Sequence, residues 1–303
     1  MRPEIEEAGR LIQNKDRKSL EAALALLQGT VYSFSMKVCG QKQDAEDTMQ
    51  EVLLQSVPKL SLFESPKALM VWLYKVARTR CLMSRRKSKF APKQTLSLEE
   101  LMPDRRELES LSGKAEGTPE TSLLRKETAK RLREAVQTLP PDYRVILVLH
   151  DMEELSDADI AEITGLQPGT IRVRLHRARL FVRKELARQG RQLSREPTGK
   201  SHAVVAEKPR QRRCKEMFAE LSNYLDDELD DSLCEELEKH FEGCEPCKAF
   251  LSSLENSIQQ CKSTPNETPD PDAAARLRRE LISQYQTVMA KITRNSAVSP
   301  AQK

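Results

Sequence analysis

The sequence predicts an all-α protein built from three modules. Aromatic residues make up only 4% of the 303 residues, and Gly and Pro number 10 and 16. Several long stretches repeat apolar residues at helical spacing, and no stretch indicates a strand with any clarity. Two polar segments that are expected to be linkers, 91–119 and 189–212, separate these helical stretches.

The first module, 5–90, carries helical periodicity over 4–38, 43–60 and 67–89. Gly40 interrupts the pattern, and Pro66 disfavours a helical conformation at the residue before it. Cys39 and Cys81 stand alone on these apolar stretches, so we expect both to be small core residues. The module is therefore a compact helical domain.

The second module, 120–188, contains a helix-turn-helix pattern. Ser156 followed by Asp159 predicts a capping box, Gly165 predicts a turn with positive φ, and Pro168 suits the first turn of the next helix. In that helix the apolar residues fall on one side, which leaves a polar, basic side suited to the DNA major groove. A surface helix with ordinary basic residues is the alternative. The residues expected on the outer or flanking side are Thr170, Arg172, Val173, Arg174, His176 and Arg177, and all of these except Val173 are candidates for DNA contact.

The third module, 213–254, has metal-ligand spacing. Cys214, His240, Cys244 and Cys247 follow the pattern C-x25-H-x3-C-x2-C. Three thiolates and one imidazole complete a tetrahedral shell around one zinc ion, and a closed shell is structural rather than catalytic. A metal-free cluster in a small helical hairpin is the alternative, and Cys234 is a rival first ligand that we expect not to bind. The remaining residues, 255–303, form a tail with a helix predicted at 272–292.

Charge is segregated along the chain, although the net charge is only +4. Basic residues concentrate in 78–93 and 172–188, whereas acidic residues dominate between 216 and 245. Solvated helix faces would explain one such run. Two basic runs followed by an acidic one favour a polyanionic partner and a module that competes with it.

Several classes of protein are disfavoured by the sequence. No apolar run approaches the roughly 18 residues that span a bilayer. The N-terminus lacks the features of a secretory signal, so we expect a cytoplasmic protein with no membrane contact. No nucleophile–base set or phosphate-binding loop is visible, and a closed zinc shell has no position for substrate, so we do not expect an enzyme.

Three motifs in the second module together resemble region 4 of bacterial extracytoplasmic-function sigma factors. They are LPPDYR at 139–144, DIAEITG at 159–165 and GTIRVRLHRAR at 169–179. In that family region 4 reads the promoter −35 element. The resemblance implies that Thr170, Arg172, Arg174 and Arg177 lie at the DNA.

The first module resembles region 2 of the same family. QDAEDTMQEVLLQS at 43–56 is similar to the helix that docks on the β′ clamp of core RNA polymerase, and 72–87 is similar to the segment that reads the −10 element. Thr79 and Met83 replace the usual Asn and Asp, which puts the −10 preference in doubt. The implied polymerase-binding residues are Asp44, Asp47, Gln50 and Glu51, and the cations expected at −10 DNA are Arg78, Arg80, Arg85 and Arg86.

Residues 214–250 resemble zinc-associated anti-sigma domains. As separate proteins these domains lie between regions 2 and 4 and block polymerase, whereas here the module is fused to the sigma-like half. We therefore hypothesise that it regulates that half in cis through its acidic face. A second hypothesis is that the zinc site responds to oxidants, and a purely structural zinc is the alternative to it.

The function predicted is that of a sigma factor that binds core RNA polymerase and initiates transcription at promoters. Two other functions stay open at this point. One is a helix-turn-helix regulator that binds an operator. The other is an adaptor that binds a protein partner through the zinc module and the 272–292 helix.

Overall fold

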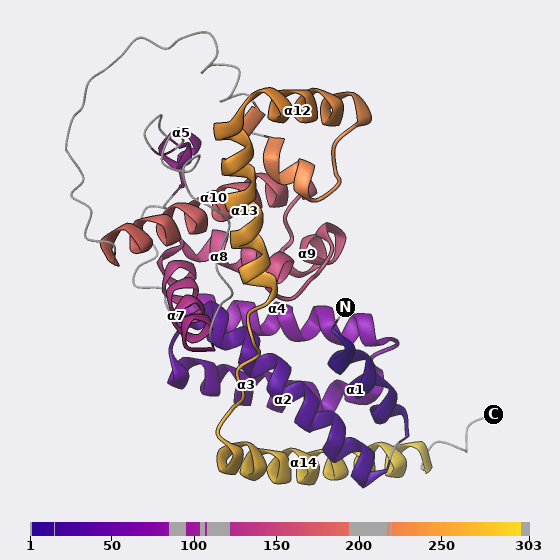
Figure 1. The fold of residues 1–303 in the computed structure, drawn as a ribbon. Helices are drawn as coiled ribbons and strands as arrows, with labels where there is room; N and C mark the ends of the chain where they lie inside the picture. Colours follow the sequence, from indigo (N-terminus) through magenta and orange to yellow (C-terminus); the bar gives the residue numbers. More distant parts are fainter. Residues whose placement is uncertain are drawn as a thin grey trace. The chain divides into compact units, whose positions relative to one another are not determined.

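The computed structural model describes residues 2–14, 16–84, 95–103, 107, 122–193, 217, 218 and 220–297. Every regular element in this part of the chain is helical (Figure 1). The contacts divide the chain into two compact units, each assembled from separate stretches of sequence. Unit 1 contains Met1–Ala91, Glu153–Gly165 and Pro265–Lys303, and unit 2 contains Pro92–Met152 and Leu166–Thr264.

Unit 1 begins with helices whose ends follow local sequence signals. The periodic stretch 4–38 divides into α1 (Pro3–Gln13) and α2 (Arg17–Cys39), because the Asp16 side chain accepts a hydrogen bond of 2.9 Å from the Ser19 amide and caps a new helix. Gly40 ends α2 with a φ of 76°, a left-handed conformation that glycine adopts at low cost. The unit continues with α3 (Lys42–Ser56), the 3-10 helix η1 (Val57–Leu62) and α4 (Pro66–Ser84).

Two further helices from distant parts of the sequence complete unit 1. The short helix α9 (Asp157–Thr164) packs against α4, and the C-terminal helix α14 (Pro271–Ala297) packs against α2, η1 and α3 (Figure 1). Gln28 on α2 is buried and bonds the docked helix twice: its amide nitrogen donates to the Ala274 carbonyl at 3.0 Å, and its amide oxygen accepts from Arg278 at 2.7 Å. The predicted helix 272–292 is therefore confirmed and is slightly longer than expected.

The prediction for the two cysteines of unit 1 was incomplete. Cys39 and Cys81 are fully buried, as predicted, but they are joined in a disulfide with a Cα–Cα distance of 5.2 Å. The two cysteines are 42 residues apart in the sequence, so no local pattern predicted that they would pair. The packing of α2 against α4 brings the two side chains together.

Unit 2 contains α5 (Leu98–Leu101), α7 (Ser122–Thr138), α8 (Pro141–Leu147) and the π-helical turn η2 (Val148–Met152). Pro141 takes the first position of α8, where a missing amide hydrogen costs nothing. Buried Arg144 ties the start of α8 to the end of α7 by donating to the carbonyls of Val136, Gln137 and Leu139. The long helix α10 (Pro168–Leu193) packs against α7 and α8 and extends past residue 188 into the predicted linker 189–212.

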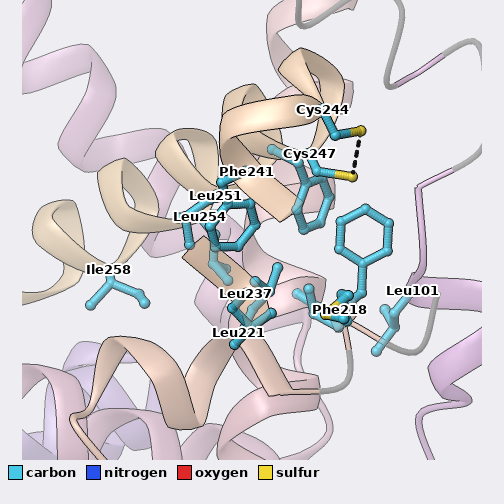
Figure 2. Packing of buried hydrophobic residues seen from close by; sticks show 13 residues of the cluster. Leu101, Phe218, Leu221, Leu237, Phe241, Cys244, Cys247, Leu251, Leu254 and Ile258 are labelled. Atoms are coloured by element: carbon cyan, nitrogen blue, oxygen red, sulfur yellow. Dashed lines mark hydrogen bonds between the residues drawn. The ribbon is translucent and has the colours of Figure 1, made fainter. Parts of the chain in front are cut away.

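The remaining helices of unit 2 are α12 (Asp231–Gly243), α13 (Glu245–Lys262) and the helical residues 220–225. Their buried side chains form one apolar cluster with members from α5 and α10 (Figure 2). The Phe218 and Phe250 rings belong to it and are buried, with centroids 4.7 Å apart. Among the helices that the structure describes, we find none with the length and apolar character needed to cross a membrane.

Candidate nucleic-acid interface and metal centre

The turn between α9 and α10 has the local geometry that the sequence predicts. The Ser156 hydroxyl accepts from the Asp159 amide at 3.2 Å, which confirms Ser156 as the N-cap of α9. The Asp159 carboxylate accepts from the same hydroxyl at 2.9 Å rather than from the Ser156 amide, as a full capping box would require. Gly165 ends α9 with a φ of 72°. Helix α10 then begins at Pro168.

Helix α10 buries the apolar side that its sequence pattern indicates. Ile171, Leu175 and Ala178 are each at most 2% exposed, whereas Thr170 and Val173 are exposed. The predicted inward face is confirmed. The outward face carries the side chains expected at DNA, so their partners in the structure decide whether that face is open.

Several predicted DNA-binding side chains of α10 have partners in the acidic stretch that follows. Arg172 forms an ion pair with Glu228, and the ring nitrogen Nδ1 of His176 lies 2.8 Å from the Ser222 hydroxyl. Both partners fall within the predicted zinc module. The remaining two arginines have partners elsewhere in unit 2: Arg174 lies 3.8 Å from the Asp142 carboxylate, and Arg177 donates to the Leu96 carbonyl at 3.1 Å.

Burial changes the charge that α10 presents. Desolvation, reinforced by the nearby positive charges of Arg179 and Arg177, lowers the pKa of His176 to about 4. The ring is therefore neutral at physiological pH, and it is only 7% exposed. In this conformation His176 therefore adds no positive charge to the outer face of α10, and its burial keeps the ring away from solvent.

Arg179 is the central charged residue of this surface, although it was not among the predicted site residues. Its guanidinium is 1% exposed and binds two carboxylates at once, Asp151 at 2.6 and 2.9 Å and Asp226 at 2.6 and 2.9 Å. Burial acts to raise the pKa of Asp151, but Arg179 and the adjacent His150 outweigh it and lower that pKa to about 2. Asp151 could have been noticed in the sequence, since a carboxylate inside the apolar run 142–153 needs a buried cation.

Helix α10 also makes apolar contacts with the zinc module. Leu180 of α10 is fully buried in the same cluster as Phe218, Leu237 and Phe250. The Arg183 guanidinium lies 4.1 Å from the centre of the Phe250 ring, a cation–π distance. Helix α10 therefore shares one core with the helices that follow it, in addition to the polar contacts.

Three of the four predicted zinc ligands lie together. His240 near the end of α12, Cys244 at the start of α13 and Cys247 one turn later place their ligand atoms within 4.8 Å of one another. The two sulfur atoms are 3.4 Å apart (Figure 2). Ligand atoms of a tetrahedral zinc shell, about 2.0–2.3 Å from the metal, are separated by roughly 3.3–3.8 Å, so the thiol pair fits such a shell. Cys214 lies outside the described residues, and Cys234 is half-buried on α12.

The predicted polymerase-binding residues lie along α3. Asp47 and Gln50 are exposed, and Asp44 and Glu51 are half-exposed. Glu51 accepts from Arg80 of α4 at 2.6 Å, and Gln43 donates to Asp47 at 3.1 Å within α3. Most of this polar face is therefore open to solvent.

Two of the four arginines predicted to contact the −10 element lie in the described part of α4. Arg78 is half-buried, Arg80 is exposed apart from its pair with Glu51, and Arg85 and Arg86 lie outside the described residues. The two residues that depart from the family pattern, Thr79 and Met83, are both exposed. Thr79 donates its hydroxyl to the Lys75 carbonyl at 2.7 Å.

Comparison with known families assigns three segments of the chain. Residues 24–90 match the model described as Sigma-70 region 2, and residues 129–182 match Sigma-70, region 4. Residues 214–248 match a model described as a putative zinc-finger. The two sigma segments contain α3, α4, α9 and most of α10, and the zinc-finger segment contains α12 with all three clustered ligands.

The chain is also similar to curated sigma factors along its sigma-like half. It is 25% identical over 175 residues to the ECF RNA polymerase sigma factor SigW of Bacillus subtilis, a match that covers 58% of this chain and 92% of SigW. It is 26% identical over 178 residues to the RNA polymerase sigma-H factor of Pseudomonas aeruginosa, with 58% and 90% covered. A third match, 30% identical over 137 residues, is to the ECF RNA polymerase sigma factor SigM of Mycobacterium tuberculosis, with 45% and 61% covered.

The matches to SigW and to the sigma-H factor cover about nine-tenths of each relative. Roughly two-fifths of this chain lies outside those matches. The sigma-like part of this chain therefore corresponds to almost the full length of these relatives. The zinc-finger segment is additional sequence in this chain. The chain therefore contains segments that match sigma-70 regions 2 and 4, is similar over that half to extracytoplasmic-function sigma factors, and carries a segment that matches a putative zinc-finger behind region 4.

Proposed function

We propose that this protein is a sigma factor whose zinc module inhibits its own reading of the −35 element. The sigma half binds core RNA polymerase through α3, reads the −10 element with α4 and reads the −35 element with α10. The module holds α10 in a form whose basic side chains are already occupied. It acts in cis as an anti-sigma domain.

The observation that carries this proposal is the pairing of α10 with residues 222–228 of the zinc module, which lie ahead of α12. Asp226, Glu228 and Ser222 engage Arg179, Arg172 and His176. DNA recognition by a helix needs its arginines available for phosphates and guanine edges. A helix whose cations are held by carboxylates of the same chain must break those contacts before it can bind DNA.

Zinc is the cofactor that we propose for the module. His240, Cys244 and Cys247 would bind it, with Cys214 as the fourth ligand, and the metal would fasten the start of α13 to the end of α12. Helices this short contribute little apolar burial on their own, so a metal stabilises the fold that covers α10. The short distance between the two sulfur atoms also supports the hypothesis of a redox-responsive site; retention of zinc after peroxide treatment, with no new disulfide, would rule that out.

Deletion of residues 205–303 tests the proposal. Transcription by purified core polymerase from a library of promoter sequences should rise in the truncated chain relative to the full chain, and promoter specificity should be retained. Unchanged activity and unchanged affinity for core polymerase would contradict inhibition in cis. An operator-binding regulator, by contrast, would bind DNA without core polymerase and would not direct initiation.

A further inference from the structure

A second set of buried charges in unit 1 joins part of region 4 to region 2. Glu153, which lies just before α9, has a side chain that is 0% exposed. Its carboxylate accepts from Lys37 of α2 at 2.9 Å and from the Tyr74 hydroxyl of α4 at 2.6 Å, and it forms an ion pair with Arg2. All three of these partners are hydrogen-bond donors, and two of them are cations.

The helix that follows Glu153 also contacts region 2. Helix α9 packs on α4, and Asp159 of α9 lies 2.7 Å from the Lys67 ammonium of α4. Residues 153–165 fall within the region 4 match, whereas Lys37, Lys67 and Tyr74 fall within the region 2 match. The first helix of the −35-reading motif is therefore held on the helix expected to read the −10 element.

Promoter geometry makes this arrangement informative. Two elements centred about 25 base pairs apart are separated by roughly 85 Å of B-DNA at about 3.4 Å per base pair. Helices in direct contact cannot serve both elements at that separation. The arrangement of unit 1 is thus a form that must open before regions 2 and 4 engage one promoter.

The residues that lead into α14 also contact the buried charges around Glu153. Lys37 also approaches the Asn266 side-chain oxygen at 3.4 Å, and Ser33 donates to that oxygen at 3.1 Å. The Glu267 amide in turn donates to the Ser33 hydroxyl at 3.3 Å. The segment that leads into α14 therefore orients the same ammonium that binds Glu153.

We propose that Glu153 is the latch of a closed state: its carboxylate holds residues 153–165 on region 2 through Lys37, Tyr74 and Arg2, and Asn266 strengthens that hold from the C-terminal segment. This inference rests on the proposed sigma function, but it is independent of the contacts between α10 and the zinc module. Removal of one partner from a buried charged network leaves the others without compensation, so the closed state depends steeply on this one side chain. Contacts with polymerase or promoter would supply the free energy that opens it.

The test compares Glu153→Gln with Glu154→Gln in the full zinc-loaded chain. The two residues are adjacent, but Glu154 is exposed, so the pair isolates the buried charge. Hydrogen exchange of the α9 amides should become about tenfold faster or more in Glu153→Gln, and transcription from the promoter library should rise. Glu154→Gln should match the unaltered chain in both measurements. In a double-mutant cycle, Asn266→Ala should lose its effect on α9 exchange once Glu153 has been replaced.

A charge-reversal pair guards against a variant that merely misfolds. Lys67→Glu should speed α9 exchange by a few-fold, and the double change Lys67→Glu with Asp159→Lys should restore it. Unchanged α9 exchange in Glu153→Gln would overturn the latch, and so would faster exchange without increased transcription. If neither the full chain nor Glu153→Gln binds core polymerase or directs any initiation, the sigma function itself fails, whereas initiation by the full chain with no gain in Glu153→Gln overturns the latch alone.

Discussion

Helices α10 and α3 carry the two surfaces that a sigma factor needs, and the structure treats them in opposite ways. On α10, Arg172, His176 and Arg179 are engaged by residues 222–228 of the zinc module, and Leu180 lies in a shared apolar core. On α3, the polar face is largely open, with Asp47 and Gln50 exposed. The difference agrees with the proposal that the zinc module acts on DNA reading rather than on polymerase docking through α3.

Metal removal is expected to have the largest effect on this contrast. Zinc sites of this kind contribute folding free energy on the order of 10 kcal/mol, so loss of the ion should unfold α12 and the start of α13. Hydrogen exchange should then become faster along α10, while exchange along α3 should stay the same. The treated chain should regain its protection when zinc is added back. Full protection of α10 in a sample shown by metal analysis to be zinc-free would contradict the role given to the metal.

Arg179→Met should have the next largest effect. The change leaves Asp151 buried without its cation, and breaking a buried pair from one side costs about 3–5 kcal/mol. Urea denaturation should show that loss in the free energy of unfolding. Arg188→Met is the matched control, because Arg188 is exposed and pairs only within its own helix with Glu185 in the contacts described, so its change should stay within about 0.5 kcal/mol. Equal losses in the two variants would mean that Arg179 is not the centre of the surface.

Acidification should weaken the covered state of α10 through His176. Its pKa is lowered to about 4, below the ordinary value of 6.5, so the folded chain binds fewer protons than the unfolded chain between these values. The contribution of the neutral ring is complete above pH 6.5 and is lost as the pH falls toward 4, by at most about 3 kcal/mol. His176→Gln should remove that part of the pH dependence. Superimposable pH profiles for the two proteins would refute this assignment.

Asp47→Asn on α3 should have the smallest effect on stability, but it should weaken binding to core polymerase. The side chain is exposed, so the free energy of unfolding should change by less than about 0.5 kcal/mol. Affinity for core polymerase should fall by a few-fold, since the change removes one charge from the docking face. Glu64→Gln removes an equally exposed charge outside α3 and should leave the affinity unaltered. If both variants bind core polymerase equally well, α3 is not the docking surface.

Local sequence signals were enough to predict much of the fold. The N-cap at Ser156, the turn at Gly165 and the inward face of α10 depend on residues a few positions apart, and all three are confirmed. The grouping of His240, Cys244 and Cys247 follows from a similarly short spacing.

Long-range pairings could not be predicted in this way. The partners of Arg179 at Asp226, of Lys37 at Glu153 and of Cys39 at Cys81 lie between 42 and 116 residues apart. No periodicity links such positions, because their contacts arise only once the helices have packed. For the same reason the sequence showed a basic face on α10 and an acidic module that could compete for it, but not which carboxylate pairs with which arginine.

The most direct test of the central claim is transcription by full-length Asp226→Asn, measured with purified core polymerase on a promoter library. The matched control is Asp227→Asn, an exposed neighbour with a φ of 55° that Asn adopts readily. Loss of one charged hydrogen-bonding partner of Arg179 should release α10 and raise initiation by roughly tenfold, while the control should behave as the unaltered chain. Equal transcription by the two variants, with zinc retained in both, would contradict inhibition through this surface.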